Sequence, residues 1–194
     1  MLTHAVPCQA LRFEQTLAFH CAPALAGIKP ADLVSIPGDR EEIVPLLRQY
    51  GAQLRPAGIR LRLLHSCPGR CLLLVYRPRR LEEQLSREEV RALLRRDGYP
   101  VEEGYGAMLR HLSARLADSE GFPHEIGLFL GYPAEDVEGF RLHGGQDFKY
   151  SGLWKVYSDV DRARQCFHRY RCCRRALCRR VQAGFRLSQL FQAA

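Results

Sequence analysis

The sequence predicts an α/β protein, with helices packed on a mixed sheet of four or five strands that includes one hairpin. Segments with helical periodicity alternate along the chain with short apolar runs, which is the pattern of this class. Two of the apolar runs are separated by a tight turn, which indicates the hairpin. The chain has 194 residues, no internal repeat and no long linker, so we expect one domain over residues 1–194.

The N-terminal part is expected to contain two helices and a strand. A helix is predicted over 11–19 and a short strand over 33–36. A second helix is predicted over 40–50, beginning after Asp39 and ending at Gly51, because aspartate is a favoured N-cap and glycine a favoured helix end.

The hairpin is predicted over residues 59–76. Apolar residues alternate with arginines over 59–63, as in a strand with one wet face. Residues 72–76 are continuously apolar, as in a central strand. Pro68-Gly69 is a turn signal between the two. The stretch CPGRC is therefore interpreted as a turn between two cysteines, with half a metal site or a redox pair as the alternative.

The second half is expected to alternate helices with two further strands. The predicted elements are helices over 79–96 (broken near Leu85-Ser86), 103–117, 133–142 and 160–181, and strands over 126–130 and 152–157. A helical turn is the alternative for residues 126–130. The last helix is the longest and carries the greatest density of arginine.

The sequence composition indicates the cellular compartment of the protein. No apolar run approaches the roughly 20 residues that cross a bilayer, and the N-terminus lacks the pattern of a signal peptide. We therefore expect a cytoplasmic protein without a membrane partner. Eight cysteines without a recognisable zinc spacing are then expected to be reduced thiols.

Three separated stretches resemble one family of bacterial proteins. They are FHCAPALAGIKPADLVSI, FPHEIGLFLGYPAEDVEGF and GLWKVYSD, in that order, and the resemblance extends from about Leu17 to about Gly184. The family is catalogued as domain of unknown function 3793 and occurs mainly in anaerobic Gram-positive bacteria. The resemblance implies one cytoplasmic domain, and it brings no activity or residue role with it.

The leading hypothesis for function is a small-molecule, metal or cofactor site where these stretches meet. His20, Cys21, His124 and Glu125 could bind a transition metal. Alternatively, Cys21 is a nucleophile with His124 as its base and Glu125 orienting the imidazole. A haem or iron site is a third possibility, because histidine and cysteine are both axial ligands. The structural alternatives are that Cys21 lies in the core and that His124 satisfies a backbone carbonyl or caps a helix.

Further residues of the same stretches are candidate ligand contacts. We expect Lys29, Tyr132 and Lys155 to contact a bound small molecule. Trp154 is expected in the core, and because Lys155 follows it in a strand, the two side chains should point to opposite faces.

A binding surface on the last helix is the alternative function. Arg171, Arg174, Arg175 and Arg179 would contact nucleic acid or an acidic protein, since the net charge is +8 and arginines crowd this segment. On a helical wheel one stripe is apolar and should be buried, and its members are Ala163, Cys166, Phe167, Tyr170, Cys173, Leu177 and Val181. Cys172 lies on the other side among arginines, which makes it a candidate reactive thiol or a plain surface cysteine.

Overall fold

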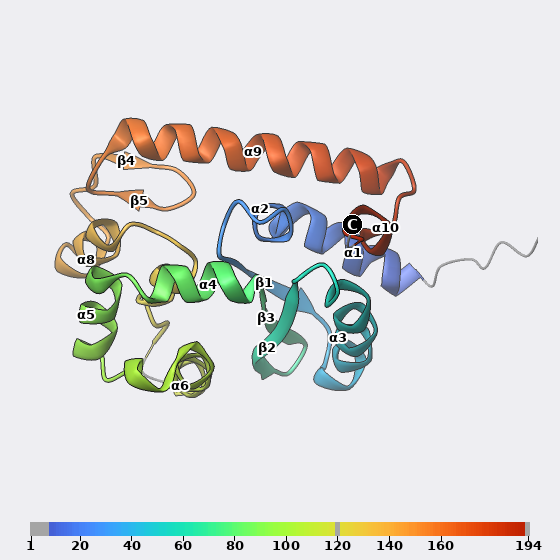
Figure 1. Cartoon of the computed structure of the whole chain (residues 1–194), viewed down its shortest axis with the longest axis horizontal. Helices are drawn as coiled ribbons and strands as arrows, with labels where there is room; N and C mark the ends of the chain where they lie inside the picture. Colours follow the sequence, from blue (N-terminus) through green and yellow to red (C-terminus); the bar gives the residue numbers. More distant parts are fainter. Residues whose placement is uncertain (1–7, 119–120, 193–194) are drawn as a thin grey trace, which may run out of the picture.

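The central sheet has three antiparallel strands in the order β1-β3-β2 (Figure 1). This computed structural model describes residues 8–118 and 121–192. The strands are β1 (Ala31–Pro37), β2 (Arg60–Cys67) and β3 (Arg70–Tyr76). The predicted hairpin is confirmed, since β2 and β3 pair antiparallel on either side of Pro68-Gly69. Gly69 has φ 72°, a left-handed conformation that glycine adopts without strain.

The predicted sheet of four or five strands is wrong, because two expected strands do not join it. Residues 126–130, predicted as a strand, contain the short helix α7 (Ile126–Phe129). All five residues are buried, and a short run buried on every side has the same pattern in a strand and in a helix. Strand β4 (Tyr150–Ser151) pairs with β5 (Lys155–Val156) in a separate sheet of two strands.

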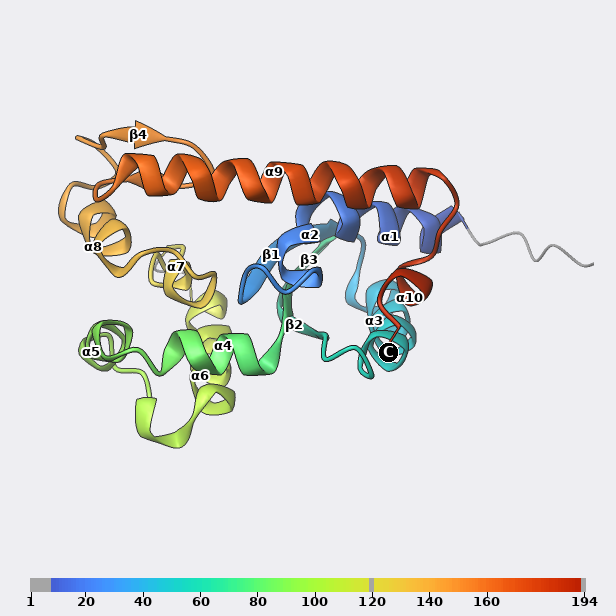
Figure 2. The same ribbon diagram turned by 45° about the horizontal axis from the view of Figure 1, so that its top comes forward.

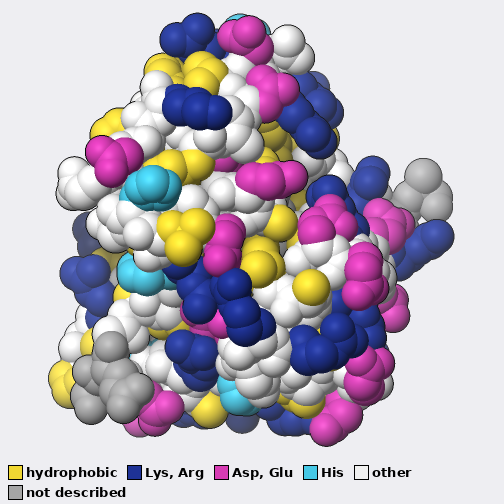
Figure 3. Space-filling model, turned by 90° about the vertical axis from the view of Figure 1, so that its left-hand side faces the viewer, with side chains coloured by type: hydrophobic (Ala, Val, Ile, Leu, Met, Phe, Trp, Pro, Cys, Tyr) yellow, Lys and Arg dark blue, Asp and Glu magenta, His cyan; other side chains and the backbone are white. Residues whose placement is uncertain are grey.

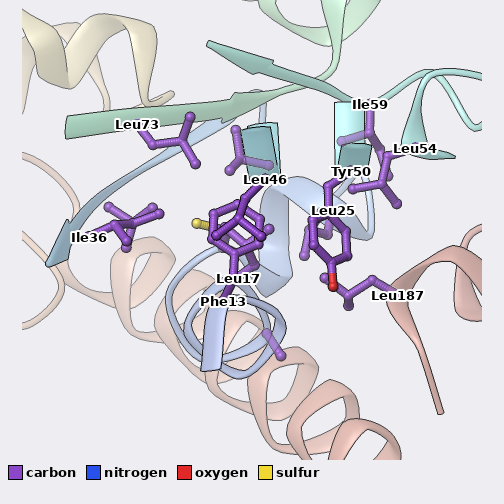
Figure 4. Close-up of a cluster of buried hydrophobic side chains, with 14 of the residues drawn as sticks. Phe13, Leu17, Leu25, Ile36, Leu46, Tyr50, Leu54, Ile59, Leu73 and Leu187 are labelled. Atoms are coloured by element: carbon purple, nitrogen blue, oxygen red, sulfur yellow. The ribbon is translucent and has the colours of Figure 1, made fainter. Parts of the chain in front are cut away.

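One face of the central sheet is covered by helices from both ends of the chain. These are α1 (Cys8–His20), α2 (Ala22–Leu25), α3 (Arg40–Leu54) and α10 (Leu187–Leu190). Leu73 and Val75 of β3 point into this core, which Figure 4 shows around Phe13, Leu17 and Tyr50.

The other face packs against a second group of helices. They are α4 (Pro78–Leu85), α5 (Glu88–Arg96), the 3-10 turn η1 (Val101–Glu103), α6 (Tyr105–Ala117), α7 and α8 (Ala134–Leu142). Leu74 and Tyr76 point into this second core, because neighbouring side chains of a strand lie on opposite faces. The sheet therefore separates two hydrophobic clusters.

Helix α9 (Val160–Gln182) runs along the length of the molecule over α1 and α2 (Figures 1 and 2). It begins at Asp159, whose Oδ1 accepts a hydrogen bond from the backbone N–H of Arg162 at 3.0 Å. The predicted core stripe is confirmed at five positions, which are Ala163, Phe167, Tyr170, Leu177 and Val181. Cys166 and Cys173 of that stripe are half-buried.

Most predicted helix positions agree with the structure, but the start of the first helix and the end of the second were wrong, since α1 already begins at Cys8. Helix α3 continues past Gly51 to Leu54, because Gly51 keeps a helical conformation there instead of reversing the chain. Asp39 precedes α3 as predicted, but its carboxylate accepts from the backbone N–H of Gly69 at 2.7 Å and so ties the helix start to the hairpin turn. Within the two described ranges, none of the helices is both long and apolar enough to cross a membrane.

Candidate functional site

A cavity of about 450 Å³ lies between α7, α8 and the β4–β5 hairpin. Figure 3 views the molecule from the end where α8 and the hairpin lie, and hydrophobic side chains are exposed there among charged ones and histidines. Most of the wall is apolar or aromatic, and it includes Phe122, Ile126, Leu130, Val137, Phe140 and Trp154. The polar side chains in the wall are those of His124, Asp136 and Lys155.

The three stretches that carry the family resemblance all contribute to this wall. The upstream stretch supplies Leu33 from β1, and the middle stretch supplies nine residues between Phe122 and Phe140. The downstream stretch supplies the consecutive residues 153–155. Segments separated by about a hundred residues therefore meet around one cavity.

Asp136 holds the hairpin against α8. Its carboxylate is 2% exposed and accepts three hydrogen bonds, from Trp154 Nε1 at 2.7 Å and from the backbone N–H groups of Tyr157 and Ser158 at 2.8 Å each. A buried carboxylate that accepts three hydrogen bonds is largely satisfied where it stands, so Asp136 fixes the position of the Trp154 ring.

His124 and Lys155 are the polar groups that a bound molecule could reach. The His124 side chain is exposed, and its ring lies against Phe140 with centroids 4.7 Å apart. The Lys155 ammonium donates to the carbonyl of Gly145, and it lies 4.9 Å from the centre of the Phe148 ring. An ammonium has three donors, so Lys155 retains donors for a further acceptor.

Tyr132 connects the cavity to a buried ion pair. Its ring stacks on Trp154 with centroids 4.6 Å apart, and the Lys29 ammonium lies 5.3 Å from its centre on a cation–π contact. Lys29 Nζ also pairs with Asp32 Oδ1 at 2.5 Å, and both side chains are less than a tenth exposed. Of the three predicted ligand contacts, Tyr132 and Lys155 line the cavity, while Lys29 lies outside the wall and supports Tyr132.

His124 and Glu125 are neighbours in sequence with different environments. The Glu125 carboxylate is buried, accepts from the Tyr99 hydroxyl at 2.9 Å, and pairs with Arg115 Nε at 3.0 Å. Burial and the Glu125 charge raise the pKa of Tyr99 well above its usual range. Glu125 thus ties α7 to the segments around Tyr99 and α6, and it makes no hydrogen bond to His124 within the described part of the chain.

His20 and Cys21 are also sequence neighbours with different environments. Cys21 is fully buried in the cluster that contains Phe13 and Leu17, and burial raises the pKa of its thiol well above the ordinary value. His20 is exposed at the end of α1, where partial burial and the Arg174 charge lower the pKa of its imidazole. The buried Cys21 thiol is therefore a poor nucleophile, because the thiolate is the reactive form and burial disfavours it.

The structure does not assemble the predicted metal or catalytic sets. His20 and Cys21 belong to the side of the sheet covered by α1, whereas Glu125 packs among the helices of the other side. Over residues 8–118 and 121–192, no group of three or more His, Cys, Asp or Glu side chains could hold a metal ion. The haem alternative depended on the same histidines and cysteines and gains no support from this geometry. In CPGRC, Cys67 is exposed and Cys71 buried, as expected for a plain turn.

The four arginines that were predicted to contact nucleic acid or an acidic protein differ in solvent exposure. Arg171, Arg175 and Arg179 are exposed on α9. Arg174 is half-buried, and its guanidinium lies 4.9 Å from the centre of the Phe19 ring. Cys172 is exposed, with Sγ 3.4 Å from His168 Nε2.

A family model described as "Protein of unknown function (DUF3793)" matches residues 17–191. The chain belongs to this family. No curated protein and no solved structure matches the chain.

Two buried aspartates that hold segments of this DUF3793 chain together were not predicted from the sequence to have that role. Asp32 is the charged residue inside the apolar strand β1, and Asp136 lies in the first turn of α8. A carboxylate in an apolar strand signals a buried partner, since a buried charge is paired or hydrogen-bonded. Asp136 had no such signal, because acidic residues are common in the first turn of any helix.

Proposed function

We propose that this DUF3793 protein binds a small anionic molecule with an apolar or aromatic body in the cavity between α7, α8 and the β4–β5 hairpin. The observation that carries the proposal is the cavity itself. Small-molecule sites are concave, of roughly 300–1,000 Å³, and mostly apolar with a few polar groups that orient the ligand. The cavity of about 450 Å³ has this size and composition.

The polar groups of the cavity wall, and the hydrogen bonds that they already make, indicate the charge of the ligand. Asp136 is saturated by three donors, so the wall offers little to a cation. Lys155 retains hydrogen-bond donors, and His124 presents an exposed ring at the rim. These two groups favour a carboxylate, sulfonate or phosphate on the ligand.

The chain contains one natural reporter of binding, because Trp154 is its sole tryptophan and lines the cavity. The experiment titrates the protein with 1-anilinonaphthalene-8-sulfonate, an aromatic sulfonate of the proposed class, and follows tryptophan emission. We expect saturable quenching of Trp154 at one site.

Two variants and a matched control localise the binding. Lys155→Met removes the ammonium, and we expect about a 10-fold or greater rise in Kd, since a hydrogen bond to a charged group contributes about 1.5–3 kcal/mol. Leu153→Asp puts a negative charge on the wall and should weaken the sulfonate similarly. Lys149→Met makes the same change on a neighbouring exposed lysine outside the wall and should leave Kd unchanged.

The proposal fails if Trp154 emission does not respond to the sulfonate. It also fails if both wall variants, with melting temperatures like that of the wild type, bind as well as Lys149→Met does. A neutral analogue, N-phenyl-1-naphthylamine, binding as tightly as the sulfonate would contradict the anionic part of the proposal.

A further inference from the structure

Nearly all of the net charge of the chain lies on one helix. Helix α9 contains eight arginines and one aspartate, a net +7, whereas the whole chain has a net charge of +8. The remaining residues are thus almost neutral together. A charge concentrated in this way creates a local positive potential that attracts polyanions.

The exposed side of α9 presents these charges in a line. Arg164, His168, Arg171, Arg175 and Arg179 follow one another at spacings of three or four residues and are all exposed, so they lie on one side of the helix. At 1.5 Å per residue the line extends over about 22 Å. Figures 1 and 2 show α9 along one edge of the molecule, with its inner side on α1 and α2 and its outer side uncovered.

Few of these charges are neutralised within the molecule. Among the residues that the structure describes, the α9 arginines make one carboxylate contact, Arg164 with Asp161 at 3.9 Å. By contrast, arginines on other elements have close partners, such as Arg96 with Glu138 at 2.6 Å and Arg141 with Asp97 at 2.7 Å.

A basic hollow lies beside the helix. Arg169 of α9, Arg80 of α4 and Arg87, which precedes α5, line a hollow of about 330 Å³ together with the segment 27–30. Arg80 and Arg87 each have a glutamate partner, at 3.5 and 2.5 Å, and Arg169 has none within the described ranges. Three guanidinium groups from three segments and the Glu83 carboxylate line this hollow, and guanidinium matches the geometry of phosphate.

We propose that the outer side of α9 binds double-stranded nucleic acid through its phosphates, without reading its sequence. Counterion release from a duplex provides affinity with arginine contacts alone.

A protein partner would need apolar anchors, but the exposed residues of α9 are polar apart from Cys172 and Ala176. A single strand would need aromatic rings for stacking, but the aromatic residues of α9, Phe167 and Tyr170, are buried. The exposed rings of Phe19 and Phe185 already stack with guanidinium groups of α9, those of Arg174 and Arg180. A membrane-surface helix would turn its apolar side to lipid, and that side of α9 is packed on the core.

The experiment measures binding of a fluorescein-labelled 20-base-pair DNA duplex by anisotropy between 50 and 200 mM NaCl. With about five phosphate contacts, the slope of log K against log salt is roughly −4.5, so affinity should fall about 500-fold over this range. The triple variant Arg171→Glu, Arg175→Glu and Arg179→Glu should lose at least about 100-fold in affinity and flatten that slope by at least about 2.7.

A control with the same change in net charge separates location from total charge. Arg48→Glu, Arg55→Glu and Arg110→Glu reverse three exposed arginines on or next to α3 and on α6, away from α9. We expect this control to retain the salt slope of the wild type. Circular dichroism of both triple variants checks that they are folded.

Other ligands tested in the same way identify the class of partner that α9 binds. An RNA duplex that binds like the DNA duplex would agree with phosphate recognition. The proposal is overturned if the duplex does not bind, if the two triple variants lose equal affinity, or if polyglutamate or phosphatidylglycerol vesicles bind more tightly than either duplex. The sulfonate titration of Trp154 should be unchanged in the α9 variant, so failure of this proposal and failure of the cavity proposal are separate results.

Discussion

The buried pair of Lys29 and Asp32 allows the sharpest test of the fold. We consider Lys29→Met, which keeps most of the side-chain volume and removes the charge. The variant leaves the Asp32 carboxylate with one remaining donor, the backbone N–H of Ala24 at 2.9 Å. It also removes the ammonium from the rings of Tyr132 and Tyr170, whose centres lie 5.3 and 5.8 Å from it.

The expected loss of stability follows from these contacts. Removing one partner of a buried ion pair costs about 3–5 kcal/mol, and the Ala24 hydrogen bond places Asp32 near the lower value. Each cation–π contact adds about 0.5–1 kcal/mol. We expect a total of about 4 kcal/mol, which in a chain of this size lowers Tm by roughly 8–16 °C.

The assay is urea unfolding at neutral pH, followed by circular dichroism for the wild type and three variants. These are Lys29→Met, Asp32→Asn and the double variant. The double variant removes both charges and keeps an oxygen for the Ala24 N–H, so it should recover at least half of the loss. The reasoning is refuted if Lys29→Met is within about 0.5 kcal/mol of the wild type. It is also refuted if the double variant is no more stable than Lys29→Met, because the loss would then come from packing.

Two further predictions concern a glycine and a tyrosine. Gly131 has φ 78°, and a Cβ there would lie 2.6 Å from Pro30, whereas Gly98 has φ 79° and no atom within 4 Å. Both alanine variants should show backbone strain, and Gly131→Ala should be less stable than Gly98→Ala by about a further 1–3 kcal/mol in urea unfolding. Burial and the neighbouring Glu14 raise the pKa of Tyr50 to about 12, so the folded state holds this proton above the unfolded value of about 10. The contribution of Tyr50 is therefore complete below pH 10 and lost as pH rises towards 12, and Tyr50→Phe should reduce the pH dependence of unfolding in that window; an unchanged dependence would contradict this.

The helices were the best predicted part of the fold. The stripe of α9 follows from periodicity, which depends on local sequence. The α7 segment was predicted as a strand, with a helical turn only as the alternative, because its residues are buried on every side and give no periodic signal. The small size of the central sheet could not be predicted either, since strand pairing depends on contacts between distant segments.

The sequence identified the segments that meet at the candidate cavity better than the individual residues that line it. The three stretches do meet, and Tyr132 and Lys155 line the cavity. The reactive residues were chosen as adjacent pairs, His20-Cys21 and His124-Glu125, on the assumption that neighbours share a pocket. In both pairs one member is buried and the other exposed, because consecutive side chains on a helix or turn leave the backbone in different directions.

The packing of α9 on α1 has a consequence for synthesis of the chain. Helix α1 is synthesised before α9 and before Arg186, which pairs with Glu14 of α1 at 2.7 Å. At about 5–20 residues per second, the side of α1 that contacts α9 waits roughly 8–30 s for its cover. A nascent chain at this stage exposes part of one core, so a chaperone that binds apolar segments would find this side of α1 accessible until α9 has emerged and packed on it.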